Sequence, residues 1–304
     1  MATLKEVKTK ISSVKKTKQI TSAMKMVATS RLRGAQESME AFKPYASKFA
    51  EVLGSIAGKA GEEASPLLVP REEVKKVNVI LCTSDRGLCG GFNVNLIEKA
   101  DKFIKNNLAG KEVSLTCFGK KGRDWAKKTP MSIDDQYIGI VGGKFDFSVA
   151  STSGQKLINR FLEGAVDEVY LVYSHFKNLA RQEPIVKQLL PIPSLDDMAS
   201  SGDAPAGGSG SDKDAAYLAE HICEPSSDAI LGAMLPKNIF IQIYDALLQT
   251  STSEHGARMK AMENATKACQ DMIGELQTLF NKRRQAGITS DLMDIVGGAE
   301  ALKG

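Results

Sequence analysis

The residues best placed to do chemistry lie in a glycine-rich stretch, Ser84–Asn93 (SDRGLCGGFN), which follows an apolar run. When a helix follows such a turn, its backbone N–H groups can hold a phosphate, as in dinucleotide-binding folds. The three glycines here lack the G-x-G-x-x-G spacing of those folds. The stretch therefore favours a tight turn that presents Arg86 and Leu88 outward, with nucleotide binding as the alternative.

Other catalytic and metal-binding patterns are missing from the sequence. Each of the four Gly-Lys pairs lacks the Ser or Thr that completes a phosphate-binding P-loop. The three histidines are far apart, and neither H-E-x-x-H nor G-x-S-x-G occurs. We therefore expect no catalytic residue, no bound cofactor and no metal site in this chain.

The cysteine pattern indicates a reducing compartment. The chain has five cysteines and no C-x-x-C pair: Cys82, Cys89, Cys117, Cys223 and Cys269. Three of them, Cys82, Cys117 and Cys269, lie in apolar patterns. Free cysteines in such surroundings behave as small buried apolar residues. We expect Cys82, Cys117 and Cys269 to be buried free thiols.

A long helix must begin the chain, from Leu4 to about Ala57. Apolar residues recur there at spacings of three and four, beginning with Leu4, Val7, Ile11 and Val14, which is the pattern of a coiled coil. Some 50 helical residues span about 75 Å, far more than a globular domain needs. Pro44 should kink this helix or end its straight part.

The apolar stripe of this first helix changes phase along its length. Ile20, Met24 and Val27 carry it in the middle, whereas Lys18, Thr21 and Lys25 occupy the positions that the first phase assigns to the seam. A slip of this kind resembles a stutter in a coiled coil. Either the stutter rotates the polar residues out of the seam, or the seam opens there.

Alternating strands and helices fill the middle of the chain. Strands are predicted at 77–83, 113–118, 131–140, 167–176 and 182–192, and helices at 94–108, 120–128 and 150–162. The order βαβαβαββ predicts a three-layer α/β (Rossmann-like) domain with a mainly parallel sheet. A Ser-, Gly- and Pro-rich stretch, 194–214, then predicts a flexible surface loop.

Helical periodicity returns in the last part of the chain. Its apolar positions keep the 3–4 spacing and are extended beyond Gly287 by Ile288, Leu292 and Ile295: Met259, Met262, Cys269, Ile273, Leu276 and Phe280. The two terminal stripes should pair as a long antiparallel coiled coil, because the chain leaves along one helix and returns along the other. The predicted parts are an N-terminal coiled-coil helix (1–58), a central α/β domain (72–193), the flexible loop (194–214) and a C-terminal coiled-coil helix (215–304).

Charge is unevenly distributed. Residues 1–60 hold 12 Lys and Arg against 4 Asp and Glu, a net charge of +8, whereas the whole chain has +4. A basic helix can simply be solvated, or it can bind nucleic acid. Nucleic-acid binders interleave aromatic residues with basic ones, and the first 40 residues contain no aromatic residue. No apolar run approaches the roughly 18 residues of a membrane helix, so we expect no membrane insertion.

Three stretches together resemble one family. They are Val14–Arg33 (VKKTKQITSAMKMVATSRLR), the glycine-rich Ser84–Asn93, and Phe280–Thr289 (FNKRRQAGIT), which continues into Asp291–Gly298 (DLMDIVGG). In this order and spacing they resemble the gamma subunit of F-type rotary ATP synthase. The resemblance covers essentially the whole chain except the loop around 200–213.

The resemblance implies a non-catalytic rotor shaft. One copy stands inside a hexamer of three alpha and three beta subunits, and its globular domain sits with the epsilon subunit on the membrane ring of c subunits. Proton or sodium-ion flow turns the ring and the shaft. The shaft thereby couples rotation to the conformations of the catalytic beta subunits, and it regulates ATPase activity and ion flow. The expected place is the cytoplasmic face of a bacterial inner membrane, as a peripheral protein without nucleic acid as a partner.

The resemblance also assigns roles to individual positions. Contacts with beta subunits are expected at these matching positions: Met24, Arg31, Arg33, Arg86, Cys89, Arg258, Arg284, Gln285 and Thr289. The segment from Ile288 to Ala301 should lie in an apolar bearing of the alpha–beta ring, and a foot on the c ring and epsilon should include Tyr217, His221 and Glu224. Chloroplast members carry a redox-active cysteine pair in an insertion; the 200–213 loop has no Cys, which favours a bacterial-type member.

Overall fold

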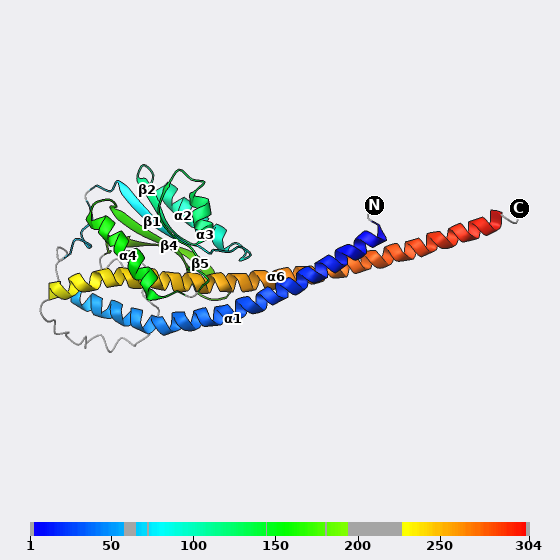
Figure 1. Cartoon of the computed structure of the whole chain (residues 1–304), viewed down its shortest axis with the longest axis horizontal. Coiled ribbons are helices and arrows are strands. Elements are labelled where there is room, and N and C mark those ends of the chain that lie inside the picture. The colour runs from blue at the N-terminus through cyan, green and yellow to red at the C-terminus, as the bar shows by residue number, and fades with distance from the viewer. Residues whose placement is uncertain are drawn as a thin grey trace, which may run out of the picture. The chain divides into compact units, whose positions relative to one another are not determined.

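The computed structural model describes residues 3–57, 65–71, 73–143, 145–179, 181–193 and 227–301. Two long helices, α1 (Leu4–Ala57) and α6 (Ser227–Ala301), enclose the remaining elements in the sequence (Figure 1). The chain divides into two compact units, one made of residues 1–29 and 258–304 and the other of residues 30–257. Both long helices contribute to both units.

A five-stranded sheet forms the centre of the unit 30–257. Its strands are β1 (Lys76–Cys82), β2 (Glu112–Phe118), β3 (Ser132–Tyr137), β4 (Glu168–Phe176) and β5 (Gln182–Leu190), in the spatial order β3-β2-β1-β4-β5. All neighbouring pairs are parallel except β4 and β5, which are antiparallel. The predicted order of elements and the mainly parallel sheet are confirmed.

Helices cover both faces of this sheet, as Figure 1 shows. On one face α2 (Phe92–Asn107) and α3 (Lys120–Ala126) pack against Val77, Val79 and Leu81 of β1. On the other face Ile80 and Cys82 join α4 (Phe147–Leu162) and the unit's parts of α1 and α6. Because β1 lies between two helical layers, its sequence is apolar almost throughout, and the three-layer prediction is confirmed.

Burial makes the sheet cysteines unreactive. Cys82 and Cys117 are fully buried on adjacent strands, and neither is in a disulfide. Burial raises the pKa of the Cys117 thiol to about 11 and moves the pKa of Cys82 still further upward. The prediction of buried free thiols is confirmed for both, whereas Cys269 is only half-buried.

The most unusual part of α6 is a buried polar segment, Thr250–His255. The Thr250 hydroxyl accepts a hydrogen bond from the backbone N–H of Ser174 at 3.5 Å, and the Ser253 hydroxyl donates to the Ser174 carbonyl at 3.3 Å. Ser174 lies near the carboxyl end of β4, on the side where doubly wound sheets usually bind ligands. In this chain α6 lies against this end of β4.

An aromatic cluster joins α1 and α6 in the same unit. Tyr244 of α6 makes edge-on ring contacts with Phe42 of α1 at a centroid distance of 4.8 Å, and with Phe145 and Phe147 at 5.7 and 5.4 Å. Such contacts add to the free energy gained by burying the rings. This packing lies beside Pro44 and stabilises the helix there.

The predicted first helix from Leu4 to about Ala57 is confirmed, and Pro44 lies inside it. A proline removes one helical hydrogen bond, and tertiary packing can compensate for that loss.

The described part of α6 begins at Ser227, so the predicted segment 215–304 starts in residues outside the described ranges. The predicted loop 194–214 also lies outside them. Among the described residues, no helix combines the length and the apolarity needed to cross a membrane.

Close packing of α4 on α6 depends on Gly154. A Cβ atom at this position would lie 2.5 Å from Phe240 Cδ1, whereas a Cβ at Gly232 on α6 would meet no atom within 4 Å. We predict that Gly154→Ala lowers the free energy of unfolding by about 1–3 kcal/mol because the helices must separate.

The matched control is Gly232→Ala, which should raise the free energy of unfolding by about 0.5–1 kcal/mol because alanine favours the helix. Urea unfolding of the purified chain measures both. Equal effects of the two substitutions would contradict the packing described here.

Candidate partner-binding surfaces

The unit 1–29/258–304 is an antiparallel pair of helices. Lys18 Nζ donates to Gln270 Oε1, Thr266 donates to Thr21 Oγ1 at 2.8 Å, and Lys25 Nζ donates to Glu263 Oε1 at 2.5 Å. As the residue number rises along α1, the partner's number falls along α6. The predicted antiparallel coiled coil is confirmed within this unit.

The seam of this coil keeps one phase throughout. Buried and half-buried positions on α1 recur at spacings of three and four: Val7, Ile11, Val14, Lys18, Thr21, Lys25 and Ala28. Ser22 and Met24 are half-buried beside this seam. Ile20 and Val27, which the sequence pattern placed in a shifted stripe, are 60% and 57% exposed. Of the two alternatives for these polar residues, rotation out of the seam by a stutter is wrong, because they stay in the seam and hydrogen-bond polar partners on α6. The other alternative, a seam that opens there, agrees with the groove beside Lys18.

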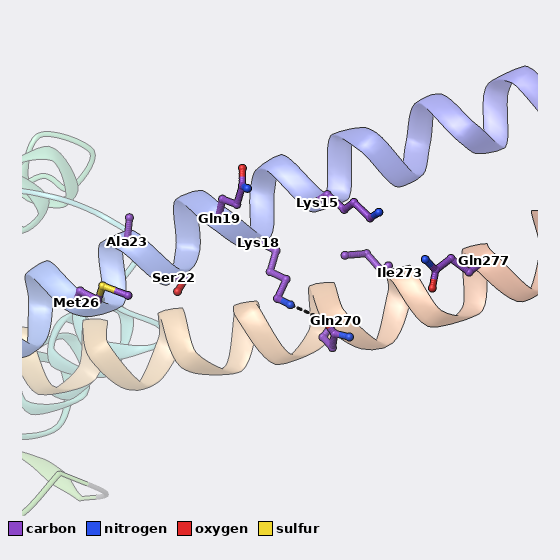
Figure 2. A pocket seen from close by; sticks show the side chains of 9 residues that line it. All are labelled: Lys15, Lys18, Gln19, Ser22, Ala23, Met26, Gln270, Ile273 and Gln277. Atoms are coloured by element: carbon purple, nitrogen blue, oxygen red, sulfur yellow. Dashed lines mark hydrogen bonds between the residues drawn. The ribbon is translucent and has the colours of Figure 1, made fainter.

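These polar layers leave a groove between the two helices. It has a volume of about 590 Å³ and lies beside Lys18, which points from α1 to Gln270 of α6 in Figure 2. Ser22 and Ala23 leave space because their side chains are small, and Ile273 of α6 also lines the groove. The hydrogen bond from Lys25, together with its charge, lowers the pKa of the Glu263 carboxyl.

Large apolar side chains lie on the outside of the same unit. Ile20, Met26 and Val27 of α1 are 60%, 69% and 57% exposed. From Arg284 onward every described residue of α6 is exposed, including Ile288, Leu292, Met293, Ile295 and Val296. The apolar residues at this end of α6 keep the spacing of the seam, but α1 does not cover them. Exposed apolar surface of this extent marks a site of protein association.

Three predicted contact residues lie on the exposed end of α6. Arg284, Gln285 and Thr289 are all exposed, and the Thr289 hydroxyl donates to the Gln285 carbonyl one turn earlier at 3.0 Å. Arg258 is half-buried. Met24 is also half-buried and directly precedes Lys25 of the polar seam.

The two predicted arginine contacts on α1 differ in their surroundings. Arg31 is exposed and donates to the Gly142 carbonyl at 3.1 Å. The Arg33 side chain is 85% exposed and pairs with Glu37 one turn later at 3.0 Å. An exposed pair of this kind contributes little stability, so Arg33 can exchange Glu37 for a partner's carboxylate at small cost.

The glycine-rich turn is held from inside. The Asn93 amide lies 3.1 Å from Cys89 Sγ and 2.8 Å from Ser84 Oγ, and these three side chains are buried. Arg86 and Leu88 are exposed, which confirms the prediction of a tight turn that presents both outward. Cys89 is only 2% exposed, so its side chain positions the turn from the interior and offers no surface to a partner.

Comparison with known proteins assigns the chain to a family. Residues 3–302 match the family model described as ATP synthase. A relative from Desulforapulum autotrophicum, named ATP synthase gamma chain, is 82% identical over 302 residues, covering 99% of this chain and all of the relative. The chain belongs to the ATP synthase gamma chain family. A gamma chain from Desulfosudis oleivorans is 63% identical, with both chains fully covered.

Solved structures agree with this fold. A chain from the Euglena gracilis mitochondrial ATP synthase has a TM-score of 0.64 at 17% identity and covers 98% of this chain and 94% of its own length. A chain from the central stalk and c ring of the Tetrahymena thermophila enzyme has a TM-score of 0.57 at 24% identity, covering 81% and 99%. These chains therefore share the fold of this chain.

The sequence pattern left the position of the polar residues open. Strict heptads counted from Val7 place Lys18, Thr21 and Lys25 in the seam, which is the alternative that the structure adopts. The apolar residues nearby gave a stronger but misleading signal. The predicted foot residues Tyr217, His221 and Glu224 lie outside the described ranges. Within those ranges, no group of three His, Cys, Asp or Glu side chains could hold a metal ion.

The single phase of the seam can be tested with one substitution at two sites. Val7 is 3% exposed and Val27 is 57% exposed on the same helix. We predict that Val7→Ala lowers the free energy of unfolding by about 1.5 kcal/mol, since two buried carbon groups are lost. Val27→Ala should change it by less than about 0.5 kcal/mol.

Urea unfolding, followed by the helical circular dichroism signal of the purified chain, measures both variants. If Val27→Ala lowered the free energy of unfolding more than Val7→Ala does, the shifted stripe would form the seam and the single phase would be contradicted.

Proposed function

We propose that this chain is the central rotor shaft of a bacterial F-type ATP synthase and performs no bond chemistry itself. One copy turns inside a hexamer of three alpha and three beta subunits and couples rotation of the membrane c ring to the catalytic sites on beta. Membership of the gamma chain family supports this role. The chain works by contacts that change with its orientation.

The exposed apolar end of α6 is the observation that carries the proposal. Ile288, Leu292 and Ile295 are between 59% and 71% exposed, and they continue a stripe that α1 covers elsewhere in the unit. A helix with such a face needs a partner to remove it from water. An apolar bearing formed by the alpha–beta ring provides that partner and leaves the helix free to turn, because apolar contacts are not directional.

Polar contacts would make the interaction with the beta subunits depend on the rotational orientation of the shaft. Arg284, Gln285 and Thr289 stand at the start of the exposed end and can hydrogen-bond a loop of beta, while Arg31 and Arg33 can meet acidic beta residues. Met24, Arg258 and Arg86 complete the proposed contact set. Exposed ion pairs are individually weak, which suits a surface that must release one beta subunit before it engages the next.

The energetic role follows from this arrangement. A shaft that presents a different side to each beta subunit makes different contacts with its open and closed conformations. Only that difference in contact free energy can shift a conformational equilibrium, and the coupling is reciprocal for binding. Rotation can therefore drive release of ATP, and ATP binding can drive rotation, so the same contacts regulate hydrolysis and proton flow.

The α/β domain is the proposed foot on the c ring and the epsilon subunit. Tyr217, His221 and Glu224 are the residues we assign to this foot. Association with the cytoplasmic face of the inner membrane would then come from these partners, and the chain would be a peripheral protein.

Specific observations weigh against two other functions. In a nucleotide-dependent enzyme the carboxyl end of β4 would be open to a ligand, but Thr250 and Ser253 of α6 hydrogen-bond Ser174 there. A basic helix that binds nucleic acid would present cations with aromatic residues. The outside of α1 instead presents Ile20, Met26 and Val27, which favour a protein partner.

Co-purification tests the proposed function directly. We predict that the tagged chain, produced with alpha, beta and epsilon subunits, forms a complex with three alpha and three beta subunits for each copy. The complex should hydrolyse ATP, and the isolated chain should not. ATP hydrolysis by the isolated chain, or the failure of alpha and beta subunits to co-purify with it, would contradict the proposal.

Coupling should depend on Met24. This half-buried residue lies beside Lys25 in the polar seam, so a second cation there would disturb the contact between shaft and beta. We predict that Met24→Lys leaves the complex assembled but lowers the number of protons pumped per ATP hydrolysed.

The matched control is Met24→Leu, which keeps the apolar volume. Proton pumping by inverted membrane vesicles, normalised to ATP hydrolysis, distinguishes the two variants. If both variants pumped the same number of protons per ATP hydrolysed, Met24 would not belong to the proposed contacts with beta.

A further inference from the structure

The groove between α1 and α6 has different linings at its two ends. Lys15 and Lys18 lie toward one end, and Ala23 and Met26 lie at the other, as Figure 2 shows. An α-helix rises about 1.5 Å per residue, so Lys15 and Met26 are about 16 Å apart along the axis of α1. The groove is therefore elongated, cationic toward one end and apolar at the other.

The two cations have no counter-ion in the part of the chain that the structure describes. Lys25 pairs with Glu263 across the helices, whereas Lys15 forms no ion pair and Lys18 donates to the neutral Gln270 Oε1. No acidic side chain lines the groove among the described residues. Lys18 is also half-buried, and a charge that is partly removed from water attracts an opposite charge more strongly. The cationic end of the groove therefore favours an anion.

The apolar part of the lining is aliphatic. Ile273 of α6 is only 6% exposed, and it lines the groove together with Ala23 and Met26 of α1. None of the described lining residues is aromatic, so a flat aromatic ring would find no ring to stack on. An alkyl chain needs no such partner, because it gains free energy from burial alone.

The size of the groove favours a small organic molecule. Its volume of about 590 Å³ lies within the range of small-molecule sites. Inorganic phosphate would occupy the cationic end and leave the apolar end empty. A partner helix would need an apolar stripe over several turns, whereas Ala23 and Met26 lie within one turn of α1.

We propose that this groove binds a small amphipathic anion, an alkyl carboxylate. Its head group lies between Lys15 and Lys18, and its chain runs past Ala23 toward Met26. Charge attraction then holds the head group, and burial of methylene groups supplies the remaining affinity. The lining belongs entirely to the unit 1–29/258–304, and the proposal does not depend on the shaft function.

Calorimetric titration of the purified full-length chain tests the ligand class. Decanoate, kept below the concentration at which it forms micelles, should bind saturably and about fourfold or more tighter than octanoate, because two more methylene groups are buried. Decanol, acetate and inorganic phosphate should each bind at least about 10-fold more weakly than decanoate. Equal affinities of decanoate and octanoate, or of decanoate and decanol, would overturn the proposal, as would phosphate binding as tight as that of decanoate.

Two lysine variants separate a local site from general attraction to a basic helix. Lys15→Gln should weaken decanoate binding about threefold to fivefold, because it removes a charge beside the head group. The matched control is Lys16→Gln, which removes the same charge from an exposed neighbour that does not line the groove. It should change the affinity by less than about twofold. Equal weakening by both variants would show general attraction and overturn the proposal.

A third variant, Ala23→Leu, tests the path of the alkyl chain. Leucine forms helices readily and fills the apolar end, so this variant should keep the helical circular dichroism signal and bind decanoate about 10-fold more weakly. Unchanged affinity would show that the chain does not run past Ala23. Absence of saturable decanoate binding to the unmodified chain would overturn the proposal and leave the shaft function untouched.

Discussion

The pairing of α1 with α6 is the constraint on which the rest of the structure depends. Neither helix can bury its apolar stripe alone, and each finds its partner at the opposite end of the chain. Everything between them must therefore fold as an insertion that returns the chain to its starting point. The α/β domain does this with parallel strands and short crossover helices, and its last strand, β5, reverses direction before α6 begins.

Polar residues have opposite roles in the two units. In the unit 30–257 the segment Thr250–His255 is buried beside β4, and two of its hydroxyls hydrogen-bond the backbone of Ser174. In the unit 1–29/258–304, Lys18, Thr21 and Lys25 are half-buried in a seam where apolar residues would bind more strongly. Polar layers in a coiled coil fix the register of the helices at some cost in stability. In a rotor shaft, a fixed register determines which side each beta subunit meets.

The surfaces available to partners follow from what the chain leaves uncovered. Every residue of α6 from Arg284 to Ala301 is exposed, and the turn at Leu88 is held outward by its own buried polar side chains. A shaft needs both kinds of surface. The apolar end permits rotation because such contacts have no preferred direction, whereas charged and hydrogen-bonding residues distinguish one orientation from another.

The sequence alone determined the order of the elements, the mainly parallel sheet and the pairing of the terminal helices, because these follow from local periodicity and chain connectivity. It also identified Arg86 and Leu88 as outward-facing. Tertiary structure decided the rest. The contacts with Gln270, Thr266 and Glu263 keep Lys18, Thr21 and Lys25 in the seam, which the sequence pattern left open. Cys89 is buried because Ser84 and Asn93 meet it there, a contact that spacing along the chain does not encode.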